Sequence, residues 1–356
     1  MNTLTEIDRL LVDTALRLCA DHGSREALEA AEAAGWSEQL WNALVESGLT
    51  RVGISEAEGG SGGTAAQAAE LVRISGYAAA PVPLAESLLV GGPILAAAGI
   101  SPPDGPLAVA PETGRLTVAR RDGCWTVSGR IAAVPWARMA ELMVALASGE
   151  TGPVVVAVPL ADAGIVPGRN YAGEPRDTVT VSGVVVAAPT PAADAGVDAT
   201  TWRLRGALAR SLQIAGALER VLELTVRHAK EREQFGRPIA RFQAVGHMIA
   251  LLGEAVAQAR MAAETAAAGA RPDDAAIAKI IAGEAATKGA ALAHQVHGAM
   301  GTTRECDLQW FTRRLWSWRD EFGSETEWAR ALGAELGRGG AGRLWEVVTA
   351  TPEEQR

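Results

Sequence analysis

Residues 232–239 read Arg-Glu-Gln-Phe-Gly-Arg-Pro-Ile, and Phe242-Gln243 follow shortly after. The stretch lies between two long Ala/Leu-rich segments whose apolar residues recur at helical spacing. An aromatic residue, a glycine and a proline close together interrupt that spacing, so we expect the chain to leave the helix here. Arginine pairs with phosphate oxygens in a planar, often bidentate geometry, and Phe235 adds a flat face. The stretch therefore favours a loop that binds a ligand carrying a pyrophosphate and a flat ring.

Composition restricts the class of protein. The chain has 356 residues, enough for two or three domains, and its 48% hydrophobic and 21% charged residues are typical of a globular protein. A net charge of −9 argues against a nucleic-acid-binding body. The start at Met1 is polar and no run of about 18 apolar residues occurs, so we expect neither a signal peptide nor a membrane span.

Cysteine and histidine usage predicts neither a disulfide framework nor a metal site. The three cysteines, Cys19, Cys124 and Cys306, are an odd number without paired spacing. This usage is typical of reduced thiols in a cytoplasmic protein. The five histidines form no cluster with Asp or Glu at the spacing of metal ligands.

The order of segments predicts an α+β fold. Helical periodicity dominates the first hundred residues and returns after the connector at 189–197, whereas the segment between is rich in Val, Thr and Gly. The expected domains are an N-terminal all-α domain (1–103), a small middle β domain (104–197), a C-terminal four-helix bundle (198–340) and a tail (341–356). The expected strands are 115–119, 124–129, 142–146, 154–158, 178–181 and 184–186, and the expected C-terminal helices are 200–231, 240–269, 272–301 and 306–336.

Five features in this order resemble the acyl-CoA dehydrogenase family. They are the helical pattern at 40–49, the acidic residue and glycines of 56–63, the Trp-Thr-Val-Ser-Gly-Arg strand at 125–130, the stretch 232–243, and Gln-Val-His-Gly-Ala-Met-Gly at 295–301. The resemblance implies the fold of that family, with helices before and after a middle β domain. It also implies α,β-dehydrogenation of an acyl-CoA thioester with FAD as the cofactor.

The resemblance also assigns residues to FAD, which this family binds at a subunit interface. Arg232 would contact the pyrophosphate, with Gln234 and Phe235 flanking it. The other assigned positions are Ile239 and Gln243 on the adenine side, Gln295 and Gly298 reaching the pyrophosphate or adenine from the neighbouring subunit, and Ser324 in place of a flavin-contacting threonine. Glycine suits position 298 because the backbone must approach the phosphates closely.

The catalytic positions depart from the family pattern. The reaction needs a carboxylate that removes the proton α to the thioester carbonyl. Most members place this glutamate just before a Gly-Thr pair, and Phe322 stands there in this chain. A smaller group places it 26 residues before the arginine of the FAD stretch, at or near Gly206 here. Glu321 is a nearby candidate base, although one residue turns a helical side chain by about 100°.

The middle domain lacks groups that touch the flavin ring in this family, since Ala132-Ala133-Val134 replaces the usual contacts. The pattern resembles the short subunits of two-gene acyl-CoA dehydrogenases from bacterial steroid and related degradation. We therefore hypothesise a partner subunit of a hetero-oligomer. The alternatives are a self-sufficient homo-oligomeric dehydrogenase with Glu321 as base, and a non-catalytic scaffold without flavin. The expected partners are an acyl-CoA substrate, a second dehydrogenase subunit or a second copy, and an electron-transfer acceptor.

Small residues on the first C-terminal helix leave one question open. Ala207, Ala209, Ala215 and Gly216 could leave room for a bulky acyl group such as a steroid side chain. They could equally let two helices pack closely.

Overall fold

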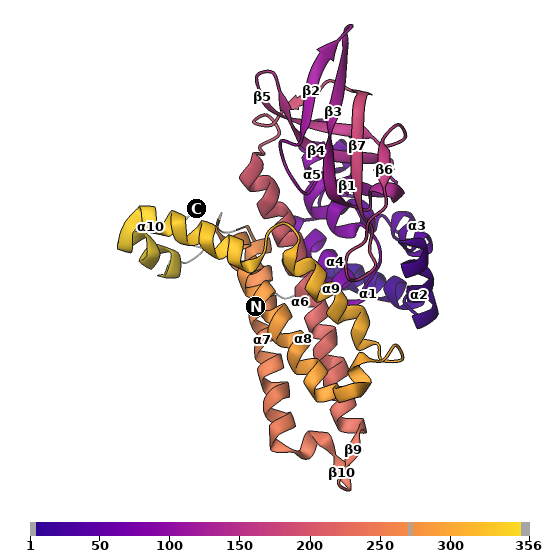
Figure 1. The fold of residues 1–356 in the computed structure, drawn as a ribbon, viewed down its shortest axis with the longest axis vertical. Helices are drawn as coiled ribbons and strands as arrows, with labels where there is room; N and C mark the ends of the chain where they lie inside the picture. The colour runs from indigo at the N-terminus through magenta and orange to yellow at the C-terminus, as the bar shows by residue number, and fades with distance from the viewer. Residues whose placement is uncertain (1–4, 270, 272, 350–356) are drawn as a thin grey trace.

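The computed structural model describes residues 5–269, 271 and 273–349, and its N-terminal part is helical (Figure 1). Polar residues start these helices: Ser37, for example, caps α3 by accepting a hydrogen bond from the backbone N–H of Leu40 at 3.3 Å. The elements are α1 (Glu6–Asp21), α2 (Arg25–Ala34), α3 (Glu38–Glu46), α4 (Ala65–Tyr77), a π-helical turn (Glu86–Val90) and α5 (Gly91–Ala97).

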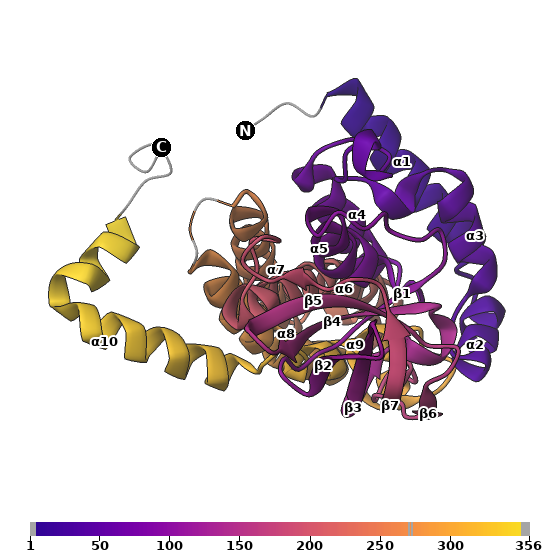
Figure 2. The ribbon, with the colours of Figure 1, turned by 90° about the horizontal axis from the view of Figure 1, so that it is seen from above.

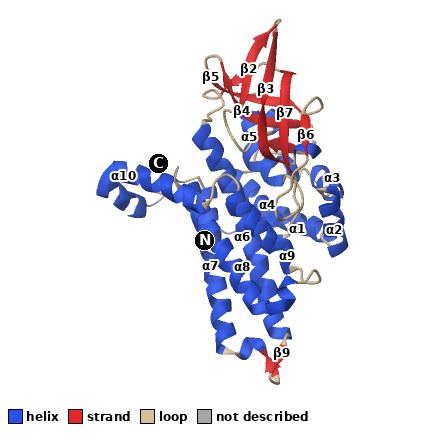
Figure 3. Ribbon diagram, in the orientation of Figure 1, coloured by secondary structure: helices blue, strands red, loops and turns tan. Residues whose placement is uncertain are grey.

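The middle part is a mixed sheet that caps one end of the molecule (Figure 3). Its strand order is β6-β7-β3-β2-β4-β5-β8, and β1 pairs with β4 in parallel. The two strands expected at 178–181 and 184–186 form one long strand, because β7 pairs with β3 along most of its length. The bounds are β1 (Leu107–Val109), β2 (Leu116–Arg121), β3 (Cys124–Pro135), β4 (Leu142–Gly149), β5 (Gly152–Pro159), β6 (Gly164–Val166), β7 (Arg176–Val186) and β8 (Thr190–Pro191).

The C-terminal part is a helical bundle formed by α6 (Ala199–Glu231), α7 (Gln243–Ala267), α8 (Asp274–His297) and α9 (Leu308–Asp320). A short hairpin, β9 (Glu233–Gln234) and β10 (Arg237–Pro238), joins α6 to α7 at the end of the bundle remote from the sheet (Figure 1). The α+β order of helices, sheet and helices is therefore as predicted. The domain limits at 103/104 and 197/198 stay predictions.

The single helix expected over 306–336 is wrong. The chain ends α9 at Asp320 and begins α10 (Glu325–Thr349) after a turn in which Phe322 and Gly323 have φ of 55° and 97°. Such left-handed backbone cannot continue an α-helix. The expected tail at 341–356 is also partly helical, because α10 runs past a non-helical residue, Gly340, to Thr349 and extends away from the body (Figure 2). Residues 350–356 lie outside the described part.

Two large hydrophobic clusters and a small third one hold the described parts together. The first is shared by the N-terminal helices, the sheet and α6, through residues such as Leu71, Val144 and Trp202. The second lies inside the bundle and includes Leu218 and Leu315. No described helix is long and apolar enough to cross a membrane.

The small residues of α6 serve close helix packing. Gly216 lies against α4, where a Cβ would overlap the carbonyl oxygen of Arg73, and Gly76 of α4 lies equally close to the carbonyl of Gln213. Ala209 and Ala215 are both buried in the first core. These glycines therefore bring two backbones into contact and leave no room for an acyl group between α4 and α6.

Substituting Gly216 by Ala should destabilise the chain by about 1–3 kcal/mol, because the added methyl group overpacks the α4–α6 contact. The matched control is Gly246→Ala on exposed α7, where a Cβ meets nothing within 4 Å. That control should be neutral or stabilising by up to about 1 kcal/mol, since alanine favours helix. Urea unfolding followed by circular dichroism measures both, and equal midpoints for the two variants would contradict the packing.

Candidate functional site

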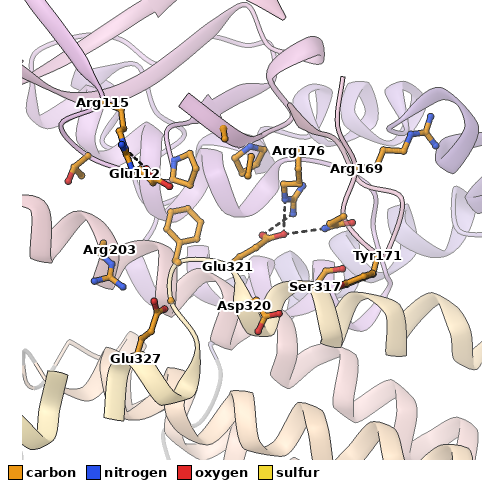
Figure 4. A pocket seen from close by; sticks show the side chains of 18 of the residues that line it. Glu112, Arg115, Arg169, Tyr171, Arg176, Arg203, Ser317, Asp320, Glu321 and Glu327 are labelled. Atoms are coloured by element: carbon orange, nitrogen blue, oxygen red, sulfur yellow. Dashed lines mark hydrogen bonds and ion pairs between the residues drawn. The ribbon is translucent and has the colours of Figure 1, made fainter. Parts of the chain in front are cut away.

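A cavity of about 1180 Å³ lies between the sheet and the bundle (Figure 4). Its walls come from the loop after β1, the end of β3, the β6–β7 loop, the first turns of α6 and the α9–α10 turn. Residues Thr113, Ala133, Tyr171, Arg203, Glu321 and Phe322 are among those that line it.

The Glu321 side chain points toward Arg176 of the sheet (Figure 4). Arg210 of α6 also forms an ion pair with this carboxylate. One carboxylate oxygen accepts hydrogen bonds from Arg176 Nε at 2.7 Å and Asn170 Nδ2 at 3.2 Å. The other accepts from Arg176 Nη2 at 2.9 Å and Arg210 Nε at 2.7 Å. Four donors on two oxygens leave this carboxylate little capacity to accept a further proton.

The lowered pKa of Glu321 also argues against proton uptake by this carboxylate. Burial alone would raise the pKa of Glu321, but the charges of Arg176 and Arg210 and the hydrogen bonds outweigh it and hold the pKa at about 2. A general base works best with a pKa near the operating pH. The surroundings therefore favour a structural role for Glu321, and its assignment as the catalytic base stays a prediction.

The ion pairs of Glu321 extend into a buried alternating network. Arg210 also binds Glu86 of the N-terminal part at 2.5 Å, and both side chains are 2% exposed. On the other side Arg176 binds Glu174, which is paired with Arg314 of α9 at 3.1 Å. The network contains three acids and three arginines, so its formal charges cancel, and it connects all three parts of the fold.

The two positions where the family carries its base touch each other here. The Phe322 ring covers Gly206 so closely that a Cβ on Gly206 would overlap it. The same ring lies 5.6 Å from the guanidinium carbon of Arg210. Hydrocarbon therefore occupies the place of a carboxylate, and neither position offers a proton acceptor.

Ser324 lies at the same turn, where it caps α10. Its backbone N–H donates to Glu327 Oε2 at 2.9 Å, and its hydroxyl accepts from the backbone N–H of Glu327 at 3.4 Å. A flavin contact from Ser324 stays a prediction.

The other predicted FAD residues lie at the opposite end of α6, around the β9–β10 hairpin (Figure 1). Arg232 is the C-cap of α6 and is exposed, and Phe235 is 93% exposed with φ of 53°. None of the described residues forms an ion pair with Arg232. We call this group the hairpin end: Arg232, Gln234, Phe235, Ile239, Gln243, Gln295 and Gly298.

Sequence reasoning brought the hairpin-end residues together but missed the buried arginines. Arg210 stands alone between apolar residues on α6, which signals a buried charge without naming its partners. Those partners, Glu86 and Glu321, lie 124 and 111 residues away in the chain. No group of three or more His, Cys, Asp or Glu in the described ranges is arranged to hold a metal ion.

Comparisons with known proteins agree with this architecture. The chain matches the N-terminal domain of acyl-CoA dehydrogenases over residues 5–99 and their C-terminal domain over residues 194–325. It is 31% identical to the acyl-CoA dehydrogenase IpdE2 of Mycolicibacterium smegmatis, over 94% of this chain and 100% of that protein. The chain therefore belongs to the acyl-CoA dehydrogenase family of FAD-dependent oxidoreductases.

Solved structures share the fold at low identity. The ChsE4-ChsE5 complex from Mycobacterium tuberculosis superposes with a TM-score of 0.86 at 24% identity, covering 94% of this chain and 98% of the other. The Tcur3481-Tcur3483 steroid acyl-CoA dehydrogenase G363A variant superposes with a TM-score of 0.82 at 24% identity, covering 95% and 100%.

Substituting Glu321 by Gln should destabilise the fold by roughly 3–5 kcal/mol, because it leaves two buried arginines with one carboxylate fewer. The matched control is Asp320→Asn on the exposed neighbouring residue, which should stay within about 0.5 kcal/mol of wild type.

The pH dependence gives a second readout of the same interaction. The lowered pKa of Glu321 stabilises the folded state above the ordinary glutamate pKa of 4.5, and this contribution is lost as the pH falls toward about 2. The Gln variant should therefore lose less stability over that window than wild type. Thermal unfolding across this pH range measures the difference, and unchanged stability of Glu321→Gln would contradict a structural role.

Proposed function

We propose that this chain is the partner subunit of a hetero-oligomeric acyl-CoA dehydrogenase, in which its hairpin end binds the adenine-diphosphate half of an FAD. The flavin ring of that FAD lies in the cavity of the other subunit. The observation that carries the proposal is the contact of Phe322 with Gly206, which fills both family positions for the base.

The first support is the missing proton acceptor. Phe322 and Gly206 have no titratable group, and the carboxylate of Glu321 is committed to Arg176 and Arg210. Removal of the α-proton of a thioester needs a free base close to it. Neither family position for the base supplies one in this chain, which supports a base contributed by a second subunit.

The second support is the exposure of the hairpin end. The Phe235 side chain is 93% exposed and so forgoes the free energy that burying its ring would contribute. An exposed aromatic ring close to an exposed arginine, Arg232, is typical of a surface that a ligand or partner covers. Gly298 has φ of 59°, and no atom lies within 4 Å of where its Cβ would stand, so a ligand can approach this face of the turn closely, although the N–H of Gly298 itself is donated to the carbonyl oxygen of His294. These groups fit a pyrophosphate.

The third support is the distance between the two ends of α6. Gly206 at the cavity and Arg232 at the hairpin end are 26 residues apart on this helix, which is about 39 Å at about 1.5 Å per residue. One FAD cannot reach from one to the other. The hairpin end therefore serves an FAD whose ring is held by another chain.

FAD accepts the hydride from the β-carbon of the substrate when it is bound, and a separate electron-transfer acceptor reoxidises it. This chain's residues would bind and orient the dinucleotide. The similarity to a two-chain complex and to a steroid dehydrogenase supports a hetero-oligomer acting on a steroid-derived or fatty acyl-CoA. The alternatives are a homo-oligomer using Glu321 and a flavin-free scaffold.

Purification of the tagged chain from its own cells tests the assembly. We expect a complex that contains a second, different dehydrogenase chain and bound flavin, whereas the chain expressed alone is flavin-poor. Native mass spectrometry and the flavin absorbance at about 450 nm measure composition and cofactor content. A chain that alone binds one FAD and oxidises an acyl-CoA would contradict the proposal.

Substituting Arg232 by Ala should weaken FAD binding to the complex by roughly 10- to 100-fold, because a charge-assisted hydrogen bond to phosphate is lost. The matched control is Arg330→Ala, an exposed arginine of α10. That control should leave FAD binding unchanged. Flavin fluorescence during titration measures the dissociation constants, and equal constants for both variants would remove Arg232 from the FAD site.

A further inference from the structure

Two imidazole rings stack between α6 and α8 beside the hairpin end. The ring centroids of His228 and His297 are 4.4 Å apart, and the ring planes are inclined by 19°. His297 is 7% exposed, and its Nδ1 lies 2.9 Å from the carbonyl oxygen of Ala293, one turn earlier in α8. His228 is half-buried on the facing side of α6. The face-to-face contact thus joins the C-terminal ends of two helices.

Each ring is attached directly to one side of the hairpin end. The backbone N–H of Arg232 donates a hydrogen bond to the carbonyl oxygen of His228 at 2.8 Å. The backbone of Arg232 is therefore held directly by one of the two stacked residues. On the other helix, Gly298 follows His297 immediately, and Gln295 precedes it by two residues.

The turn after α8 packs closely against the base of the His297 side chain. A Cβ on Gly301 would lie 2.8 Å from the Cβ of His297 and 3.2 Å from Nδ1 of His294. Glycine at this position therefore lets the turn pack closely against the Cβ of His297 and the ring of His294. The glycine of the sequence pattern at 295–301 thus has a steric role distinct from any contact with a ligand.

We propose that the His228–His297 stack is the positioning contact that sets Arg232 of α6 against Gly298 of α8, and that it holds them only while both rings are uncharged. The proposal rests on the function proposed above, because it assigns the alignment of the two sides of the same dinucleotide site. Neither ring needs to touch the dinucleotide, so both are positioning residues.

The surroundings favour neutral rings. Burial lowers the pKa of His297, and the nearby His228 and His294 add to this effect, whereas the hydrogen bond to Ala293 opposes it. Burial also lowers the pKa of His228, with Arg232 adding to and Glu231 opposing that effect. The titratable and charged groups that face the pair are Arg227, Glu231 and Arg232 of α6, His294 of α8, and Glu305, Cys306 and Asp307 of the segment before α9.

Acid should therefore separate the two rings. A histidine with a lowered folded pKa stabilises the fold above its ordinary value of 6.5, and this contribution is lost as the pH falls toward the lowered pKa. Two positive rings at this separation repel each other and also repel Arg232. We expect the separation of α6 from α8 at this end to weaken FAD binding.

The test uses the complex that the full-length chain forms, with FAD as the probe. His297→Ala removes the stack and should weaken FAD binding about tenfold or more at pH about 8. His297→Phe keeps a flat ring in the stack and should bind within about threefold of wild type. The double variant His228→Phe/His297→Phe should keep wild-type affinity at pH about 8 and lose less of it than wild type at pH about 5.5.

A second readout needs no cofactor. The thermal midpoint of the chain alone should fall less between these two pH values in the double Phe variant than in wild type. Equal FAD loss in the Ala and Phe variants, or FAD binding that tightens in wild type on acidification, would overturn the proposal. Arg232→Ala distinguishes the positioning role of the stack from the proposed FAD site. If Arg232→Ala weakens FAD binding but His297→Ala does not, the stack has only a structural role. If neither variant weakens FAD binding, the proposed function itself fails.

Discussion

The carboxylate of Glu321 between Arg176 and Arg210 is the interaction on which the arrangement of the three parts depends. Arg176 comes from the sheet, Arg210 from the first bundle helix, and Glu321 from the turn that ends α9. Charges buried so deeply are tolerated because acids and arginines alternate and each charged group has at least one partner of opposite charge. The network fills the junction with fixed charge, where a dehydrogenase of this family needs a base that gains and loses a proton.

The cavity beside this junction and the hairpin end fulfil different requirements. The cavity is bordered by buried ion pairs and by the ring of Phe322, and these groups stabilise the fold. The hairpin end is exposed and presents an arginine, an aromatic face and a glycine whose surroundings are open. Because α6 separates the two, either can change without disturbing the other. A chain can thus lose its own chemistry and still contribute to a neighbour's cofactor site.

Much of this fold is readable from local sequence. Short-range sequence patterns account for three features of the fold: the helix cap at Ser37, the change from helices to strands near residue 104, and the end of the helix at Glu231. The break at 321–324 is partly readable, because Gly323 can end a helix and Ser324 with Glu327 can cap the next one, whereas the positive φ of Phe322 is not, since phenylalanine rarely adopts it. The partners of Arg210 are equally hidden, since long-range pairing leaves no periodic pattern. The hairpin-end residues were identified by resemblance, and the stacked histidines became visible only when α6 and α8 were placed side by side.

The contact of Phe322 with Gly206 also bears on how such a chain evolves. While the ring covers this glycine, no side chain can be accommodated at position 206, so a carboxylate cannot return there by a single substitution. A glutamate at position 322 would enter a junction whose arginines are already neutralised by other acids. Recovery of an independent active site therefore requires several coordinated changes, each unfavourable alone. Dependence on a second chain, once established, is in this sense a one-way step.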